Sequence, residues 1–146
     1  MRKVAVDPEI ERRRQDPIPD KVEPAIEALV NDIIGKVADK WTMLIIDSLH
    51  EQGTLRFTQL RRAVGGISQK MLTQTVRQLE RDGLVKRTVH PVIPPHVDYT
   101  LTPLGDSLGA AFCGVWIWAE THHAEIEHAR ENFERRSSTA DGAAPD

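Results

Sequence analysis

The sequence predicts a mainly α-helical domain with one small β-hairpin, an α+β fold. Apolar residues recur at helical spacing over four segments between residues 24 and 82, and the period becomes two between residues 84 and 101. Helical spacing returns after Pro103 and continues toward Arg135. A chain of 146 residues, 40% of them hydrophobic and 28% charged, has room for one such domain rather than several.

The two ends of the chain differ in composition from the part between them. Residues 1–23 hold six basic residues, six acidic residues and three prolines with little apolar periodicity, so we expect a flexible N-terminal arm. Residues 137–146 are mostly small or polar, so we expect a disordered tail. One folded domain over residues 24–136 remains.

The first two helices are predicted from their end signals and their apolar faces. Pro24 can open the first helix, and Gly35 is expected to end it. Its apolar face consists of Ile26, Leu29, Val30 and Ile33. Asp39 is a suitable N-cap for the second helix, which Gly53 is expected to stop. The residues of this helix that recur at helical spacing are Trp41, Leu44, Ile45, Ser48 and Leu49, and we expect the tryptophan and the aliphatic residues in the core.

A short helix and a longer one follow. Thr58 is expected to cap the short helix, and Gly65-Gly66 allows a tight turn after it. Its expected buried face is Leu60, Ala63 and Val64. Ser68 is placed to cap the longer helix, which Gly83 closes as a left-handed residue. The buried stripe of the longer helix consists of Leu72, Val76 and Leu79, with Ile67 expected to pack on Leu72 at its start.

Two helices joined by a Gly-containing turn, over about residues 58–82, make a helix-turn-helix, a motif whose second helix enters the major groove of DNA. The face of this helix opposite the buried stripe carries polar and basic groups and no acid: Gln69, Lys70, Thr73, Gln74 and Arg77. Such side chains can bind base edges and phosphates. A helix that is amphipathic for structural reasons alone usually mixes charge signs on its outer face, so the pattern favours DNA binding.

The formal net charge of −3 is distributed unevenly. Between Leu55 and Val97 eight basic residues face two acids, a charge of +6, so the rest of the chain carries −9. A basic middle in an acidic protein suits one face that binds a polyanion, although it also suits a plain solvated surface. The expected phosphate contacts are Arg56, Arg61, Arg62 and Arg87.

The two short strands predicted over about residues 84–101 form a hairpin with a proline-rich tip from Pro91 to Pro95. A stiff, basic hairpin after a helix-turn-helix suits a wing that lies along the DNA backbone. The outward groups expected to reach DNA are Arg87, His90 and His96. The histidines could sense pH, but neutral surface histidines are the more frequent case.

The last helix is predicted over about residues 103–135, with Thr102-Pro103 at its start. Trp116 and Trp118 differ by about 200° around this helix, and one small domain can hardly cover both. A second chain could, so we expect a two-fold dimer; the alternative is a central helix wrapped by its own domain. The expected dimer interface consists of Ile26, Leu29, Val30, Ile33, Leu108, Phe112, Val115, Trp116, Trp118 and Ile126.

Several other classes of protein have little support. No nucleophile elbow, phosphate-binding loop or HExxH motif is present, so we expect no enzyme and no cofactor. No metal site is expected either, because the His- and Glu-rich segment from His122 to His128 is typical of a solvated helix surface. The longest charge-free apolar stretch, Leu108 to Ala119, is too short to cross a bilayer, and the charged N-terminus is unlike a signal peptide, so we expect a cytoplasmic protein.

Three stretches resemble the HxlR-type bacterial transcription regulators: Asp39-Lys-Trp-Thr-Met-Leu-Ile-Ile, then Arg56-Phe-Thr-Gln-Leu-Arg-Arg, then the specific run from Ile67 to Gly83. The segment from Val92 to Gly105 is similar as well. The resemblance covers about residues 26–120 and implies a homodimeric winged helix-turn-helix, related to MarR regulators, with N- and C-terminal dimerisation helices. It also implies that a palindromic operator is read by Ser68, Gln69, Lys70, Thr73, Gln74 and Arg77. Many members sense oxidants through a cysteine before the Lys-Trp motif, whereas the single cysteine here is Cys113, expected to be a small buried hydrophobe.

The expected function is therefore a dimeric, sequence-specific DNA-binding transcription regulator, a repressor by steric occlusion, although activation fits the same residues. The alternative is a winged-helix interaction module whose basic face binds an acidic protein partner. A small-molecule effector could bind near Trp41 and Trp116, although an apolar cluster of this kind is more often plain core. The operator, the regulated genes and the effector do not follow from the sequence.

Overall fold

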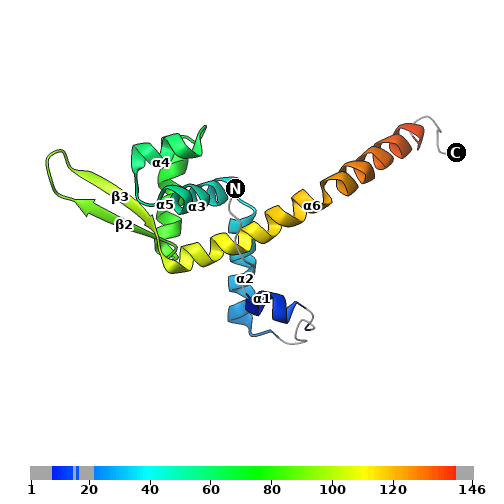
Figure 1. The fold of residues 1–146 in the computed structure, drawn as a ribbon, viewed down its shortest axis with the longest axis horizontal. Coiled ribbons are helices and arrows are strands. Elements are labelled where there is room, and N and C mark those ends of the chain that lie inside the picture. Colours follow the sequence, from blue (N-terminus) through cyan, green and yellow to red (C-terminus); the bar gives the residue numbers. More distant parts are fainter. Residues whose placement is uncertain (1–7, 15, 17–21, 141–146) are drawn as a thin grey trace.

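The computed structural model describes residues 8–14, 16 and 22–140. The helices and strands follow in the order α1 (Pro8–Arg13), α2 (Pro24–Val37), α3 (Lys40–Gln52), β1 (Leu55–Arg56), α4 (Phe57–Val64), α5 (Gln69–Arg81), β2 (Val85–His90), β3 (His96–Leu101) and α6 (Pro103–Ala140). The fold is mainly helical with a small antiparallel sheet, as the sequence predicts. The hairpin and the far end of α6 extend from opposite sides of the α3–α5 body (Figure 1).

The sheet has three strands in the order β1-β3-β2, all antiparallel. The predicted hairpin is β2 and β3, with Val85 opposite Leu101 and His90 opposite His96. The third strand, β1, was not predicted. It is only two residues long, so it carries no alternation of its own, and it forms because Leu55 pairs with Tyr99.

The core lies where α3, α4 and α5 meet the inner face of this sheet. Side chains that are almost fully buried come from every one of these elements, and Phe112 adds the contribution of α6: Ile45, Ile46, Leu49, Leu55, Leu60, Ile67, Leu72, Val76, Leu79, Leu84, Val85, Tyr99 and Phe112. Burial of this apolar surface holds the helix-turn-helix and the base of the hairpin together as one unit.

Helix α5 begins and ends as predicted. The Ser68 hydroxyl accepts a hydrogen bond from the Met71 amide at 3.1 Å, which satisfies one otherwise unpaired donor of the first turn. At the other end, Gly83 has a φ of 74° and the Leu84 amide donates to the Leu79 carbonyl at 2.9 Å. This is a Schellman ending, and it turns the chain directly into β2.

The boundaries of α2 and α4 were wrongly predicted. Gly35 does not end α2, which continues to Val37, because a single glycine inside a helix only lowers its stability. Thr58 is not the N-cap of α4: the N-cap is Arg56, two residues earlier, whose amide donates to the Gln59 side chain. Ala63 is exposed rather than buried.

Parts of both chain ends are helical. The arm expected over residues 1–23 contains a short helix, α1, on which Arg12 and Glu9 form an ion pair; residues 1–7, 15 and 17–21 lie outside the described part. The tail expected from residue 137 is helical as far as Ala140, because α6 continues past Arg135, and residues 141–146 are again outside the description.

The start of α6 is fixed to the end of α5. Thr102 caps α6 by accepting from the Gly105 amide at 3.1 Å, and its hydroxyl donates to the Gly83 carbonyl at 2.6 Å. The Thr102 amide also donates to the Leu84 carbonyl at 3.1 Å. These bonds join the turn after α5 to the first turn of α6.

Candidate DNA-binding surface

Helix α5 presents a polar surface to solvent. Its buried stripe is the predicted Leu72, Val76 and Leu79, extended by Thr75, whose buried hydroxyl donates to the Met71 carbonyl at 2.8 Å. The predicted outer positions are all exposed: Ser68, Gln69, Lys70, Thr73, Gln74 and Arg77. No carboxylate lies among them, so this face has the charge and the donors that suit a nucleic acid.

Two hydroxyls on this face are already engaged within the helix. Thr73 donates to the Gln69 carbonyl at 2.8 Å, and Ser68 accepts at the cap. Their side chains are therefore held in place, whereas Gln69, Lys70 and Gln74 are exposed and long enough to reach beyond the helix surface. The long side chains are the better candidates for contacts with base edges.

The predicted phosphate-binding arginines surround the helix-turn-helix. Arg56, Arg61 and Arg62 are exposed at the two ends of α4. The Nε of Arg61 donates to the Ile67 carbonyl at 3.3 Å, so this side chain braces the turn between α4 and α5. Because a guanidinium has five N–H donors, Arg61 keeps donors available for a second acceptor.

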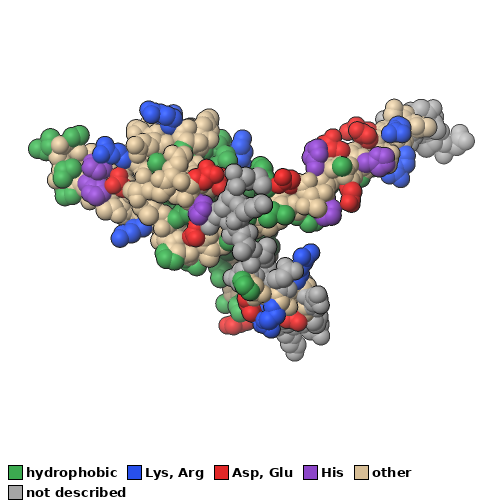
Figure 2. Space-filling view, viewed as in Figure 1, with side chains coloured by type: hydrophobic (Ala, Val, Ile, Leu, Met, Phe, Trp, Pro, Cys, Tyr) green, Lys and Arg blue, Asp and Glu red, His purple; other side chains and the backbone are tan. Residues whose placement is uncertain are grey.

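The wing does not present its three predicted outward groups on one face. Arg87 lies opposite Tyr99 in the sheet, and His90 lies opposite His96. Since side chains alternate along a strand, Arg87 lies on the Tyr99 face and the histidines lie on the other. The two imidazoles stack at 4.6 Å between centroids, and Nε2 of His90 lies 2.7 Å from an oxygen of Asp98. Figure 2 shows histidine side chains gathered on the hairpin. The histidines therefore form a cluster of their own.

An ion pair joins α5 to α2. Lys36 bonds Asp32, 2.7 Å away on its own helix, and also Asp82 just after α5. Two hydrogen bonds raise the pKa of Lys36 above its usual value: the larger effect comes from Asp32 and the smaller from Asp82. This ion pair was not predicted, because nothing in the sequence marks two residues 46 positions apart as neighbours.

A second exposed surface is apolar. On α2 it includes Ile26, Leu29 and Val30, and on α6 Val115, Trp116 and Trp118; both tryptophans are 56% exposed. Of the other residues predicted for a dimer interface, Ile33, Leu108 and Ile126 are partly buried and Phe112 belongs to the core of its own chain. The described part of the chain therefore does not wrap α6.

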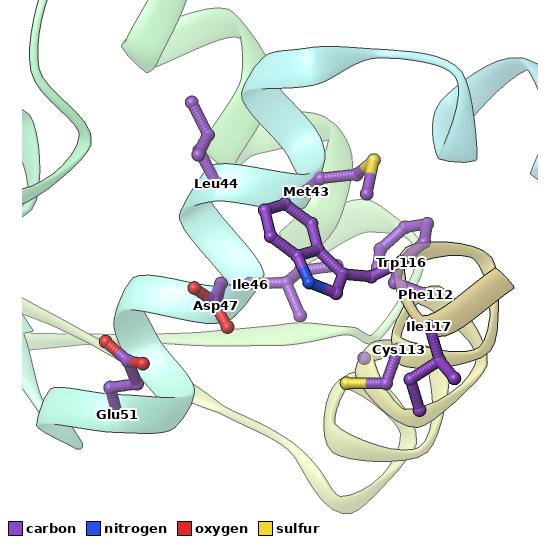
Figure 3. A pocket seen from close by; sticks show the side chains of 10 residues that line it. Met43, Leu44, Ile46, Asp47, Glu51, Phe112, Cys113, Trp116 and Ile117 are labelled. Atoms are coloured by element: carbon purple, nitrogen blue, oxygen red, sulfur yellow. The ribbon is translucent and has the colours of Figure 1, made fainter. Parts of the chain in front are cut away.

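A pocket lies between α3 and this part of α6 (Figure 3). Trp116, Cys113 and Phe112 line it from α6, and Met43 and Ile46 line it from α3. Trp41, which was expected beside Trp116 in an effector site, is not among its lining residues. Cys113 is partly exposed rather than fully buried.

The order of the elements, the exposed polar face of α5 and the β2–β3 hairpin define the class: this is a winged helix-turn-helix protein. The model of HxlR-like helix-turn-helix proteins matches residues 36–127, and the chain belongs to this family. The protein is a DNA-binding transcription regulator. The family resemblance noted in the sequence is thereby confirmed.

Known proteins similar to this chain are regulators of the same kind. The uncharacterized HTH-type transcriptional regulator YtfH of Escherichia coli is 41% identical over 100 residues, which are 68% of this chain and 79% of YtfH. A solved structure of a MarR-family regulator from Enterococcus faecalis is 34% identical, with a TM-score of 0.62 over 77% of this chain and 99% of that one. The structure of YtfH from Salmonella typhimurium is 39% identical, with a TM-score of 0.60 over 70% and 90%.

Among the described residues, no helix is both long enough and apolar enough to span a membrane. This agrees with the mixed-charge character of the second half of α6.

Proposed function

We propose that this regulator acts as a homodimer that binds a palindromic operator, with one α5 helix of each chain in the major groove and the wings along the flanking backbone. Base choice comes from Gln69, Lys70 and Gln74, and Arg77 contacts a base edge or a phosphate. The observation that carries the proposal is the acid-free, exposed outer face of α5.

Phosphate contacts come from the arginines around α4 and from Arg87 on the wing. They contribute most of the affinity but little of the sequence preference, because the DNA backbone is the same at every site. We therefore expect affinity to fall steeply as salt increases.

The dimer forms through the apolar surface of α2 and α6. Exposed tryptophans at the middle of a helix suit the buried centre of a protein interface, where aromatic residues are enriched. To match a palindrome, the two α5 helices of a two-fold dimer must lie about 34–36 Å apart, one turn of DNA.

We further propose that binding represses a promoter by occlusion, in the cytoplasm, and that the protein has no catalytic role. The α3–α6 pocket is the candidate place for a small apolar effector, because it adjoins both the core and the α6 surface.

The test is fluorescence anisotropy with the intergenic DNA upstream of the protein's own gene, compared with a scrambled duplex, at two salt concentrations. We expect specific binding that Gln74→Ala and Arg77→Ala each weaken by about fivefold to a hundredfold, the range of a lost base contact of about 1–3 kcal/mol. Gln52→Ala at the end of α3 and Arg136→Ala near the end of α6 are matched controls with exposed side chains away from α5.

Equal and weak binding to both duplexes, with no effect of the α5 substitutions, would overturn the proposed reading mode. The basic face would then be better explained as a docking surface for an acidic protein, and light scattering would still decide the dimer separately.

A further inference from the structure

Three metal-ligating side chains meet on the face of the wing that points away from the core. His90 and His96 are directly opposite each other in the β2–β3 ladder, and Asp98 lies two residues after His96, on the same face. One nitrogen from each imidazole and one oxygen of the Asp98 carboxylate all lie within 4.8 Å of one another. We propose that this cluster binds one divalent transition-metal ion per chain, with Zn²⁺ as the best fit.

The distances support a shared ion. Nε2 of His90 lies 2.7 Å and Nε2 of His96 lies 3.9 Å from the same carboxylate oxygen, Oδ2 of Asp98. Ligand atoms at about 2.0–2.2 Å from a tetrahedral Zn²⁺ are roughly 3.4 Å apart, between these two values. Small side-chain rotations are therefore enough to bring the three atoms to coordination distance, with no change in the strand register.

The chemical types of the three ligands also suit Zn²⁺. Imidazole nitrogen and carboxylate oxygen are ordinary Zn²⁺ ligands, and three protein ligands leave a fourth position for water. The side chains of His90, His96 and Asp98 are 39%, 23% and 19% exposed, so an ion and its water can reach the site from solvent. Arg56 lies opposite Asp98 in the β1–β3 ladder. Among the described residues, however, its side chain forms no ion pair with the Asp98 carboxylate, which is therefore available to a metal ion.

The histidines of α6 are a weaker alternative. His122 pairs with Glu125 at 3.4 Å and His123 with Glu127 at 3.8 Å, and Glu125 is 81% exposed. Neither pair gains a third ligand within the described residues. The wing differs in that two strands hold the three ligands together, and an ion there would link both strands next to the Pro91–Pro95 tip.

The test is calorimetric titration of the metal-stripped full chain with Zn²⁺. We expect one ion per chain, and a loss of affinity of at least tenfold in His90→Gln, His96→Gln and Asp98→Asn, since even indirect disturbance of a metal site costs about 10–100-fold. His123→Gln on α6 is the matched control and should bind like the unsubstituted chain. Zn²⁺ should also raise the melting temperature of the unsubstituted chain and of His123→Gln, but not that of His96→Gln.

Far-ultraviolet circular dichroism shows that each variant is folded before titration. The proposal is overturned if the folded unsubstituted chain takes up no stoichiometric Zn²⁺, or if the wing variants bind Zn²⁺ as tightly as it does. No DNA enters this experiment, so its outcome is independent of the proposed operator.

Discussion

Gly105 determines how closely α6 approaches the start of β2. A Cβ at this position would lie 2.0 Å from the carbonyl oxygen of Leu84 and 2.9 Å from the Leu101 side chain. Backbone cannot give way as a flexible side chain can, so Gly105→Ala should lower the free energy of unfolding by about 3 kcal/mol. Urea denaturation followed by circular dichroism measures this loss.

Gly35→Ala is the control for this substitution. Gly35 is also helical, but nothing lies within 4 Å of the point that an alanine methyl group would occupy, so alanine should stabilise the protein by about 1 kcal/mol through helix propensity alone. A Gly105→Ala variant as stable as the unsubstituted protein would show that α6 is not held against Leu84.

At the scale of single elements, the ion pair of Lys36 connects α2 with the end of α5. Its pKa is raised in the folded protein, so the charged form is favoured by folding. The stabilisation is fully present below the unfolded pKa and is lost as pH rises through the higher, folded pKa. Lys36→Met should therefore cost about 1 kcal/mol near neutral pH, and the difference from the unsubstituted protein should vanish in strongly alkaline solution.

Lys36→Arg provides the comparison, because a guanidinium stays charged in the alkaline range where lysine loses its proton. Denaturation midpoints of the three proteins, measured at neutral pH and at increasing alkalinity, give the dependence. A Lys36→Met deficit that stays constant at every pH would mean that packing of the lysine stem, not its charge, joins the two helices.

Elements with local signals were predicted well from the sequence, and elements that depend on distant partners were not. The cap at Ser68, the ending at Gly83 and the buried stripe of α5 are all set by residues within a few positions of one another. Strand β1 forms because Leu55 pairs with Tyr99. These two residues are 44 positions apart in the sequence, so no local pattern predicts the strand. The ion pair of Lys36 with Asp82 was not predicted for the same reason, because these residues are 46 positions apart.

The candidate site shows the same division. The exposed face of α5 follows from helical periodicity and was predicted residue by residue. The histidines of the wing were predicted as separate outward groups beside Arg87, although strand alternation already places them on the opposite face. Their meeting with Asp98 depends on the hairpin register, which the proline-rich tip does not fix by itself.

For the whole molecule, the exposed tryptophans of α6 predict the state of assembly. Trp118→Glu places a charge in the proposed interface, so the protein should sediment as a monomer and bind its operator more weakly. Analytical ultracentrifugation measures the mass. Val89→Glu on the wing, at a valine that is 53% exposed, is the control and should leave the mass unchanged. If the Trp118→Glu protein keeps the assembly mass of the unsubstituted protein, the dimer interface lies elsewhere.

The bonds from Thr102 to Gly83 and Leu84 have a mechanical consequence. Helix α6 has 38 residues and is about 57 Å long, so a rotation of one degree about its first turn moves its far end by about 1 Å. The end of α5 is hydrogen-bonded to this first turn. If a more distant part of α6 is held in place, a rotation of α6 therefore moves α5 instead. In a pair of chains joined at Trp116 and Trp118, about 20 Å along α6 from its first turn, a tilt of about 10° would move one α5 helix by about the 3.4 Å rise of one base pair. The angle at which the two α6 helices cross would therefore decide whether the two α5 helices match successive turns of DNA.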